Sequence, residues 1–179
     1  MTSTLLTPAS AATIATPDGP FTIIEADGAV LSSGWTASID ELTGQIHPSL
    51  RHVIDGQESP GLTLMSNAVS AYYDGDLSAI DDVIVHQISG PFRSHAWDVL
   101  RKVRPGSPVT YAQYAELAGS AGAVRAAAGA CARNAAALFV PCHRVVRTDG
   151  SLGGFRWGLE IKQRLLDREQ SASTMLFQH

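Results

Sequence analysis

The chain has 179 residues, of which 45% are hydrophobic and 17% are charged, as in compact folded proteins rather than disordered or fibrous ones. No stretch approaches the roughly 18 consecutive apolar residues of a membrane-spanning helix. The two cysteines, Cys131 and Cys142, form neither a disulfide framework nor a Cys-x-x-Cys pair, so we expect reduced thiols and a cytoplasmic protein. The net charge of −4, taken alone, argues against a nucleic-acid partner.

That charge is distributed unevenly along the chain. Residues 1–85 hold one basic and eleven acidic residues, a net charge of −10, whereas residues 86–179 hold twelve basic and six acidic residues, a net charge of +6. A polyanion could therefore bind the second half while the first half faces away. Two oppositely charged parts that attract each other would give the same numbers, and charge alone does not decide between these readings.

The start of the chain predicts an irregular leader followed by a small antiparallel sheet. Residues 1–16 are rich in Thr, Ser and Ala and lack basic residues, which indicates a loosely ordered leader rather than a signal peptide. Residues 21–26 and 29–33 are apolar runs on either side of an Asp-Gly pair, the sequence that a type I′ hairpin turn favours. One further strand is expected at residues 82–86.

A single helix should pack on this sheet. Apolar side chains recur at helical spacing between Leu62 and Tyr72, and the Asp-Gly pair that follows is a stop signal. The Gly90-Pro91 pair interrupts regular structure and is the expected boundary between an N-terminal α/β domain of residues 1–89 and a C-terminal domain of residues 90–179.

The C-terminal domain is predicted to be mostly helical, so the fold class is α+β. The second and third of its predicted helices are short and are joined by a turn that contains glycine, a spacing typical of a helix-turn-helix. Many helix pairs with this spacing bind no DNA, so the signal is weak by itself. The predicted helices of this region span residues 92–103, 111–117 and 123–132.

The third of these helices carries mostly methyl groups. Six of its ten residues are alanine, and Arg125 is its one long cation. Such a slim helix can approach a narrow groove or another backbone closely. Tight packing in the core, with Arg125 reaching out to solvent, fits the same sequence equally well.

The segment LFVPCHRVV, residues 138–146, places Cys142 beside His143 in an apolar, strand-like run. A cysteine nucleophile needs a base or a cation, because few free thiols are ionised at neutral pH. Neighbouring side chains on an extended strand point in opposite directions, so His143 would need a bend or a bridging water to reach the sulfur. A Cys-His pair alone is more often accidental than catalytic.

The last helix strengthens the case for chemistry. Ile161, Leu165 and Glu169 share one helical face, so a carboxylate lies on the buried side and needs a partner such as a histidine. A helix that frays before Glu169 would instead leave this carboxylate in solvent. The remaining faces are assigned to Lys162, Gln163, Arg164, Asp167 and Arg168.

These residues lie in a longer pattern that resembles a known family. PCHRV at residues 141–145 is followed by GGFRWGLEIKQRLLDRE at residues 153–169. With the residues that precede them, these segments resemble the O6-alkylguanine-DNA alkyltransferases, also called methylated-DNA–protein-cysteine methyltransferases. The resemblance is close over residues 92–169 and looser over the N-terminal hairpin. The preceding residues of the pattern are Phe92, Trp97, Tyr111, Arg125 and Asn134.

The resemblance implies a single-turnover transfer of an alkyl group to the protein itself. The Cys142 thiolate would attack the alkyl carbon on O6 of guanine, and guanine would leave as its anion. His143 would draw the thiol proton through a water, Glu169 would hold His143, and Tyr111 would donate its hydroxyl toward the base. No cofactor and no metal are implied.

The same resemblance implies a partner, double-stranded DNA that contains O6-alkylguanine. Chemistry on a stacked base requires extrusion of that base from the duplex. The alanine-rich helix would enter the minor groove through Ala123, Ala126 and Ala127, and Arg125 would take the vacated place in the stack. Asn134 would brace the turn before the cysteine. The base pocket would be formed by Val145, Phe155, Arg156 and Trp157.

Three positions depart from the usual family pattern, and two other functions stay open. Ala135 stands where proline is usual, Phe155 where tyrosine is common, and Ala128 where glycine is frequent. One alternative is a protein that binds alkylated bases without transfer, which Cys142 argues against. The other is a thiol hydrolase or redox sensor that uses the same Cys, His and Glu. We expect a monomer with no membrane partner, and cooperative binding along DNA is left open.

Overall fold

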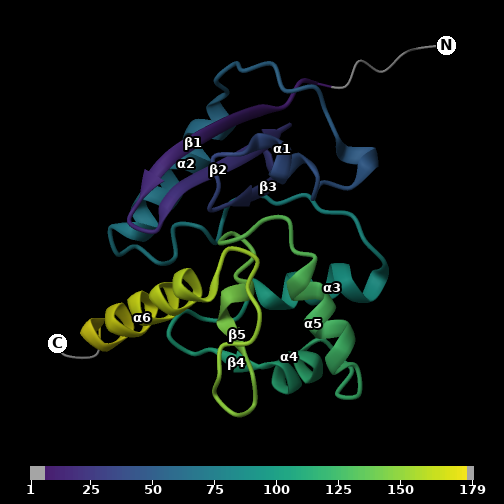
Figure 1. The fold of residues 1–179 in the computed structure, drawn as a ribbon, viewed down its shortest axis with the longest axis vertical. Helices are drawn as coiled ribbons and strands as arrows, with labels where there is room; N and C mark the ends of the chain where they lie inside the picture. The colour runs from purple at the N-terminus through teal and green to yellow at the C-terminus, as the bar shows by residue number, and fades with distance from the viewer. Residues whose placement is uncertain (1–6, 177–179) are drawn as a thin grey trace.

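The computed structural model describes residues 7–176 and has an α+β architecture (Figure 1). A three-stranded antiparallel sheet lies at one end of the molecule, and most of the helices gather at the other. The sheet contains β1 (Ser10–Thr16), β2 (Gly19–Ala26) and β3 (Ala29–Gly34) in that order. The helical segments of the first half are α1 (Ile39–Thr43), the 3-10 turn η1 (Pro48–Leu50) and α2 (Pro60–Tyr73).

The predicted hairpin is confirmed as β2 and β3. Asp27 and Gly28 have φ angles of 53° and 80°, the two positive values that a type I′ turn requires. The predicted helix is confirmed as α2, which begins after Ser59, whose hydroxyl accepts the Leu62 N–H.

The expectation of a loosely ordered leader over residues 1–16 is wrong for residues 10–16. These residues form β1, which pairs with β2 from Ser10 opposite Glu25 to Thr16 opposite Gly19. Its alternating small and β-branched residues suit a strand added to the free edge of β2. The first six residues of the predicted leader lie outside the described part of the chain.

The strand expected at residues 82–86 is also wrong. Val85 makes a single parallel bridge to Val30 of β3, flanked by hydrogen bonds that join Val30 to Ile84 and His86. A second segment occupies the same edge of β3 a little further on, where Ser33 bridges Ala136. Because two segments share this edge, neither has room to pair over a strand's length.

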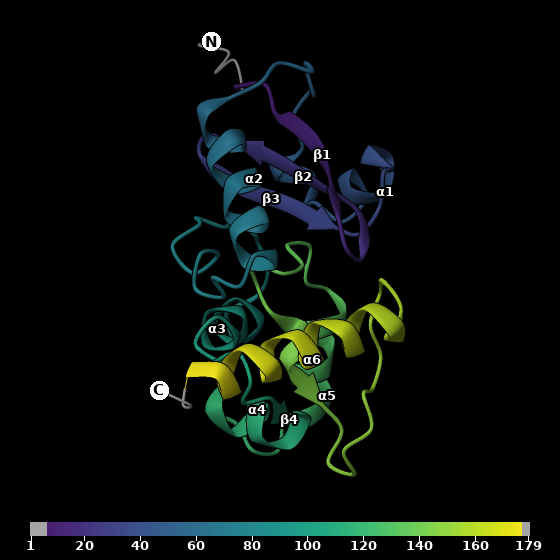
Figure 2. The same cartoon turned by 90° about the vertical axis from the view of Figure 1, so that its left-hand side faces the viewer.

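The second half contains the predicted helices and a pair of two-residue strands. Figure 2 shows the last helix, α6 (Leu159–Leu176), crossing in front of α5 (Val124–Ala132). The parallel strands β4 (Val109–Thr110) and β5 (Val145–Val146) join the segment before the helix pair to the segment after Cys142. The helices are α3 (Pro91–Leu100), α4 (Tyr111–Leu117), α5 (Val124–Ala132), the 3-10 turn η2 (Cys142–Arg144) and α6 (Leu159–Leu176).

Helices α4 and α5 form the expected pair across a glycine-bearing turn. The Thr110 hydroxyl accepts the Gln113 N–H, and the Gln113 side chain accepts the Thr110 N–H, which together make a capping box. Helix α5 begins one residue later than predicted, and Ala123 is the residue that precedes it.

The main hydrophobic core contains residues from both halves of the chain. Phe21 and Val69 from the first half belong to the same buried cluster as Trp97 and Leu100 from the second. The division at residues 89 and 90 therefore stays a prediction, although α3 begins at Pro91. Within residues 7–176, no helix is both long and apolar enough to cross a membrane.

Candidate active site

The segment that carries the cysteine is bent rather than extended, which corrects the strand-like reading of residues 138–146. Leu138 has a φ angle of 73°, and Cys142 begins the 3-10 turn η2, after which only β5 is extended. The turn buries both Cys142, which is 8% exposed, and His143, which is fully buried. The bend that the Cys-His pair was expected to need is therefore present.

The first half of the chain holds the start of this segment in place. The Ser33 N–H donates to the Ala135 carbonyl at 2.8 Å, and the Ser33 hydroxyl donates to the Ala137 carbonyl at 2.8 Å. The Ser32 hydroxyl adds a further hydrogen bond to Ala135 at 3.0 Å. Because the residues at both ends of these three hydrogen bonds are buried, the edge of β3 fixes the path of the chain toward Cys142.

His143 and Glu169 form the buried pair that the sequence predicts. The distance from His143 Nε2 to Glu169 Oε1 is 2.7 Å, and both side chains are fully buried. Glu169 lies well inside α6, so the alternative of a frayed helix end with a solvated carboxylate is excluded.

Two further donors surround the Glu169 carboxylate, and sequence reasoning missed both. The Arg144 guanidinium donates through Nε to Oε2 at 3.0 Å and through Nη2 to Oε1 at 3.0 Å. The Tyr72 hydroxyl, which comes from α2 in the first half, donates to Oε1 at 2.9 Å. Arg144 could have been found as a charge inside an apolar run, which needs a partner. Tyr72 gave no such signal, because it fits the apolar face of its helix.

These contacts determine the protonation of the pair. Burial alone would raise the pKa of Glu169, but the hydrogen bonds from His143 and Arg144, together with the Arg144 charge, outweigh it and lower this pKa to about 2. The ionised carboxylate can only accept, so the proton on the His143 ring is on Nε2. Burial lowers the pKa of His143, which leaves a neutral ring with a lone pair on Nδ1. This Nδ1 is buried and has no hydrogen-bond partner within residues 7–176.

Opposing effects act on the pKa of the Cys142 thiol. Burial raises the pKa of the Cys142 thiol, while the Asn134 amide and the Lys162 ammonium act to lower it. The Asn134 Nδ2 donates to Sγ at 3.3 Å. In the described part of the chain, no direct hydrogen bond joins Cys142 to His143. The sulfur is therefore a thiol at rest, with a donor already aimed at the charge that it gains when it reacts.

The structure places Lys162 inside the protein, against the expectation of an exposed face. The side chain is fully buried, and its ammonium donates to the carbonyls of Val145 at 2.7 Å, Leu152 at 2.5 Å and Gly154 at 3.3 Å. Lys162 thereby ties the loop after β5 to α6. The spacing of Lys162, Leu165 and Glu169 at i, i+3 and i+7 is the signal that could have revealed this buried face.

A cavity of about 630 Å³ opens next to the sulfur. Most of the predicted site residues line it, and so does Cys131, the other cysteine. Val145 is fully buried and is not among the lining residues, so only its backbone carbonyl, held by Lys162, supports the site. The predicted residues that line the cavity are Tyr111, Arg125, Asn134, Cys142, Phe155, Arg156 and Trp157.

Tyr111 and the glycine loop approach each other closely on one wall of this cavity. A Cβ atom at Gly153 would lie 3.0 Å from both Cε2 and the hydroxyl oxygen of Tyr111, and Gly153 has a φ angle of 72°. A side chain at Gly153 would therefore press on Tyr111 and hold the backbone in a conformation that L residues rarely adopt. Burial, and then the nearby cysteines, raise the pKa of Tyr111 to about 12, so its hydroxyl is a proton donor at neutral pH.

The part of the cavity wall formed by Phe155 and Trp157 rests on the N-terminal sheet. The Trp157 ring occupies the place where a side chain at Gly34 of β3 would project. The Phe155 ring packs against Trp35, with centroids 5.9 Å apart. The sheet therefore backs the loop that carries the predicted base-pocket residues.

Helix α5 has one exposed face and one face packed in the core, so both of the arrangements that fit its sequence are present. Arg125 and Ala126 are exposed and Ala123 is half-buried, so these residues can reach a partner. Ala127 is fully buried in the main core, and the expectation that it contacts DNA is wrong. Ala127 shares its helical face with Ala130, which is also fully buried, and a spacing argument could have foreseen this.

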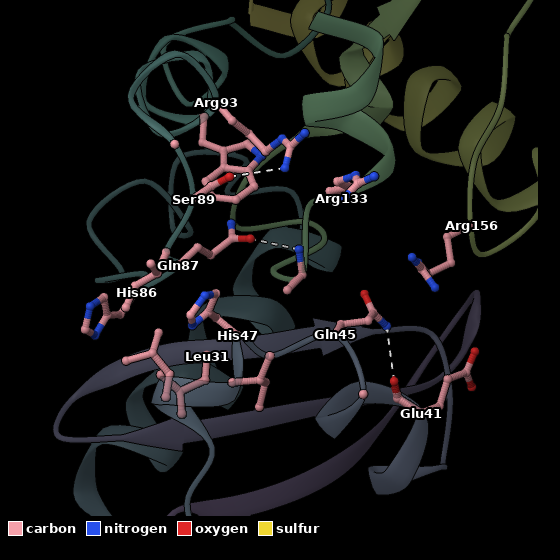
Figure 3. A pocket seen from close by; sticks show the side chains of 17 residues that line it. Leu31, Glu41, Gln45, His47, His86, Gln87, Ser89, Arg93, Arg133 and Arg156 are labelled. Carbon is pink, nitrogen blue, oxygen red and sulfur yellow. Dashed lines mark hydrogen bonds between the residues drawn. The ribbon is translucent and has the colours of Figure 1, made fainter. Parts of the chain in front are cut away.

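A second cavity, of about 740 Å³, lies between the two halves of the chain (Figure 3). Arg93, Arg133 and Arg156 line it, and Arg156 also lines the cavity at the sulfur. No carboxylate within residues 7–176 forms an ion pair with these three guanidinium groups. The described residues contain no cluster of three or more His, Cys, Asp or Glu side chains suited to a metal ion.

Comparison with known proteins assigns a family to the second half of the chain. The family profile of the 6-O-methylguanine DNA methyltransferase DNA-binding domain matches residues 91–171. The bifunctional transcriptional activator/DNA repair enzyme Ada of Escherichia coli is 50% identical over 78 residues, which are 44% of this chain and 22% of that protein. The match therefore spans less than a quarter of that relative's length.

Other matches extend over nearly the whole chain. The methylated-DNA–protein-cysteine methyltransferase of Salmonella typhimurium is 31% identical over 160 residues, which are 87% of this chain and 92% of that protein. The structure of Mycobacterium tuberculosis OGT in complex with DNA gives a TM-score of 0.74 at 26% identity, over 91% of this chain and 94% of that one. On these similarities, the chain belongs to the methylated-DNA–protein-cysteine methyltransferase family.

Proposed function

We propose that this chain repairs DNA by moving the alkyl group from O6 of guanine to the sulfur of Cys142, once and irreversibly. The observation that carries the proposal is the position of Cys142, whose sulfur borders a cavity on one side while the adjoining His143 bonds Glu169 behind it. Membership of the family supports the same chemistry. Within the described residues, no group is placed to remove an alkyl group from a thioether.

The reaction begins with loss of the thiol proton. His143 Nδ1 accepts this proton through a bridging water, and the imidazolium that results is stabilised by Glu169. The Asn134 N–H stabilises the thiolate. The sulfur lone pair then forms the S–C bond as the C–O6 bond breaks, and the bonding pair leaves with guanine.

Tyr111 assists the departure of guanine. Its hydroxyl is protonated at neutral pH and lines the cavity, so it can donate to the base as negative charge develops there. Phe155, Arg156 and Trp157 line the same space and would enclose the extruded base.

DNA binding is assigned to the exposed face of α5 and to the arginines beside it. Ala123 and Ala126 enter the minor groove, and Arg125 replaces the extruded guanine in the base stack. Arg93 and Arg133, which have no ion-pair partner in the described part of the chain, contact phosphates without reading sequence. The protein acts as a monomer in the cytoplasm, where its two free cysteines stay reduced.

The test is a repair titration with a duplex that contains one O6-methylguanine. Increasing amounts of duplex are added to a fixed amount of protein, and the guanine restored is counted. We expect a plateau at one lesion repaired per chain. Continued turnover would instead indicate a hydrolytic enzyme, and tight binding without repair would indicate a protein that only recognises the lesion.

A further inference from the structure

Gln87 lies between α2 and α3, in the wall of the second cavity, and bonds two neighbouring residues, Asn134 and Ala135, that precede the cysteine segment. The Ala135 N–H donates to Gln87 Oε1 at 2.9 Å, a bond drawn in Figure 3. The Gln87 Nε2 donates to Asn134 Oδ1 at 3.0 Å. A single side chain from the segment between α2 and α3 therefore bonds the residue that contacts the reactive sulfur.

Backbone groups of fixed polarity determine how both side-chain amides are oriented. A backbone N–H can only donate, so Ala135 requires the oxygen of Gln87, and the Gln87 amide nitrogen must then face Asn134. At the other end, the Ala136 N–H donates to Asn134 Oδ1 at 3.0 Å, and the Val140 carbonyl accepts from Nδ2 at 2.8 Å. The four contacts agree on one arrangement.

This arrangement aims a donor at the sulfur. Asn134 Oδ1 receives two hydrogen bonds, one from Gln87 and one from Ala136, while Nδ2 serves Val140 and Cys142. If the Asn134 amide turned over, its oxygen would face the Val140 carbonyl, which repels it, and would also repel the Cys142 sulfur once that sulfur is a thiolate. Asn134 is only 5% exposed, so water would not relieve that repulsion.

We propose that Gln87 is a positioning residue for alkyl transfer, which holds the Asn134 amide with its N–H toward Cys142. This rests on the proposed function, since it concerns the same sulfur. A hydrogen bond that favours the thiolate over the thiol favours loss of the proton. Gln87 thereby supports the reacting atom through Asn134, without touching it.

The experiment measures the reactivity of Cys142 in a way that needs no DNA. The full chain is treated with iodoacetamide over a range of pH, and peptide mass mapping follows the modification of Cys142 separately from that of Cys131. Gln87→Met keeps a side chain of similar length but neither donates nor accepts strongly. We expect modification about three- to tenfold slower near neutral pH, with the profile moved to higher pH. At high pH, where the thiol ionises unaided, the two rates should converge.

Gln45→Met is the matched control. Gln45 lines the same cavity, but its amide donates to the Glu41 carbonyl, at 3.5 Å, rather than to the cysteine segment. In this variant, the modification of Cys142 should follow the same pH profile as in the chain without a substitution. If Gln87→Met fails to fold, judged by its thermal unfolding, Gln87→Leu is measured in its place.

A double-mutant cycle separates positioning from general support. In an Asn134→Ala background the added Gln87→Met should change the profile no further, because Gln87 acts through Asn134. The inference is overturned if Gln87→Met leaves the profile unmoved, or if its effect is as large without Asn134 as with it. A different outcome would count against the proposed function alone. The unaltered chain would fail to repair O6-methylguanine, while Gln87→Met would still move the iodoacetamide profile of Cys142, and the role of Gln87 would stand.

Discussion

The two halves of this chain contribute in different ways to one site. The acidic first half provides Tyr72 and the sheet edge that holds the cysteine segment, and the segment just after it provides Gln87. The side chains of Tyr72 and Gln87 reach the partners of the reacting groups. The basic second half provides Cys142, His143 and Glu169. Chemistry is thus concentrated in one half, while the other fixes its geometry. A site can therefore depend on residues that lie far away in the sequence and carry no reactive group.

Removing the sulfur should produce the largest effect and separate reaction from binding. Cys142→Ala should abolish alkyl transfer while the protein still binds a duplex that contains O6-methylguanine, because the cavity and the exposed face of α5 are unchanged. A gel shift and a repair assay on the same samples measure the two properties. Cys131→Ala, which alters the other cysteine of the cavity, is the control and should retain transfer. Transfer by Cys142→Ala would refute the assignment of the nucleophile.

Removing the charge behind the histidine should produce the next largest effect. Glu169→Gln removes the negative charge that stabilises the His143 imidazolium and leaves the buried Arg144 without its counter-charge, so we expect transfer to slow by about 100-fold or more. The unfolding free energy should fall by about 3–5 kcal/mol, the usual cost of breaking a buried ion pair. Single-turnover kinetics and denaturant unfolding measure these changes.

The same variant has a predicted pH signature. The pKa of Glu169 is lowered to about 2 in the folded state, so its ionisation stabilises the fold above its ordinary pKa, and this contribution is lost as the pH falls from about 4.5 toward 2. Denaturant unfolding of the unaltered protein should show this loss, and Glu169→Gln should show less of it. Equal acid dependence in the two proteins would contradict the contacts of Glu169.

Arg125→Ala should separate DNA handling from chemistry within the second half. Arg125 is exposed and lies apart from the buried His143–Glu169 pair, so its loss should slow repair in duplex DNA by about tenfold, the cost of an unfilled base stack. The rate with free O6-benzylguanine should change little. Equal losses on the two substrates would mean that Arg125 does not assist extrusion of the base.

Tyr72→Phe should give the smallest effect and tests the supporting role of the first half. Burial raises the pKa of Tyr72, so its hydroxyl is a proton donor, and its loss should cost about 1.5–3 kcal/mol of stability and a few-fold in transfer rate. Tyr73→Phe is the control, because Tyr73 bonds Asp18 rather than Glu169. Denaturant unfolding and single-turnover rates compare the two variants, and equal transfer rates would remove Tyr72 from the account.

The sequence predicted what depends on local pattern. The hairpin at Asp27 and Gly28, helix α2 and the buried position of Glu169 all follow from spacing and turn chemistry. The resemblance to the family added the positions of Tyr111 and Arg125, which no periodicity identifies.

The misses depend on contacts between distant segments. Residues 10–16 become a strand only because β2 offers a free edge, and residues 82–86 do not, because Ala136 competes for the edge of β3. Lys162 is buried because three carbonyls of one loop meet its ammonium. Gln87 and Tyr72 become important through partners about 47 and 97 positions away, a separation that no local pattern reveals.

The central claim is that the second half's Cys142, and not its neighbour in the cavity, accepts the alkyl group. The most direct test is peptide mass mapping after reaction with a duplex that contains O6-methylguanine. We expect one added methyl group on the peptide that contains Cys142 and none on the peptide that contains Cys131. A methyl group on Cys131, or no modified peptide after complete loss of the lesion, would contradict it.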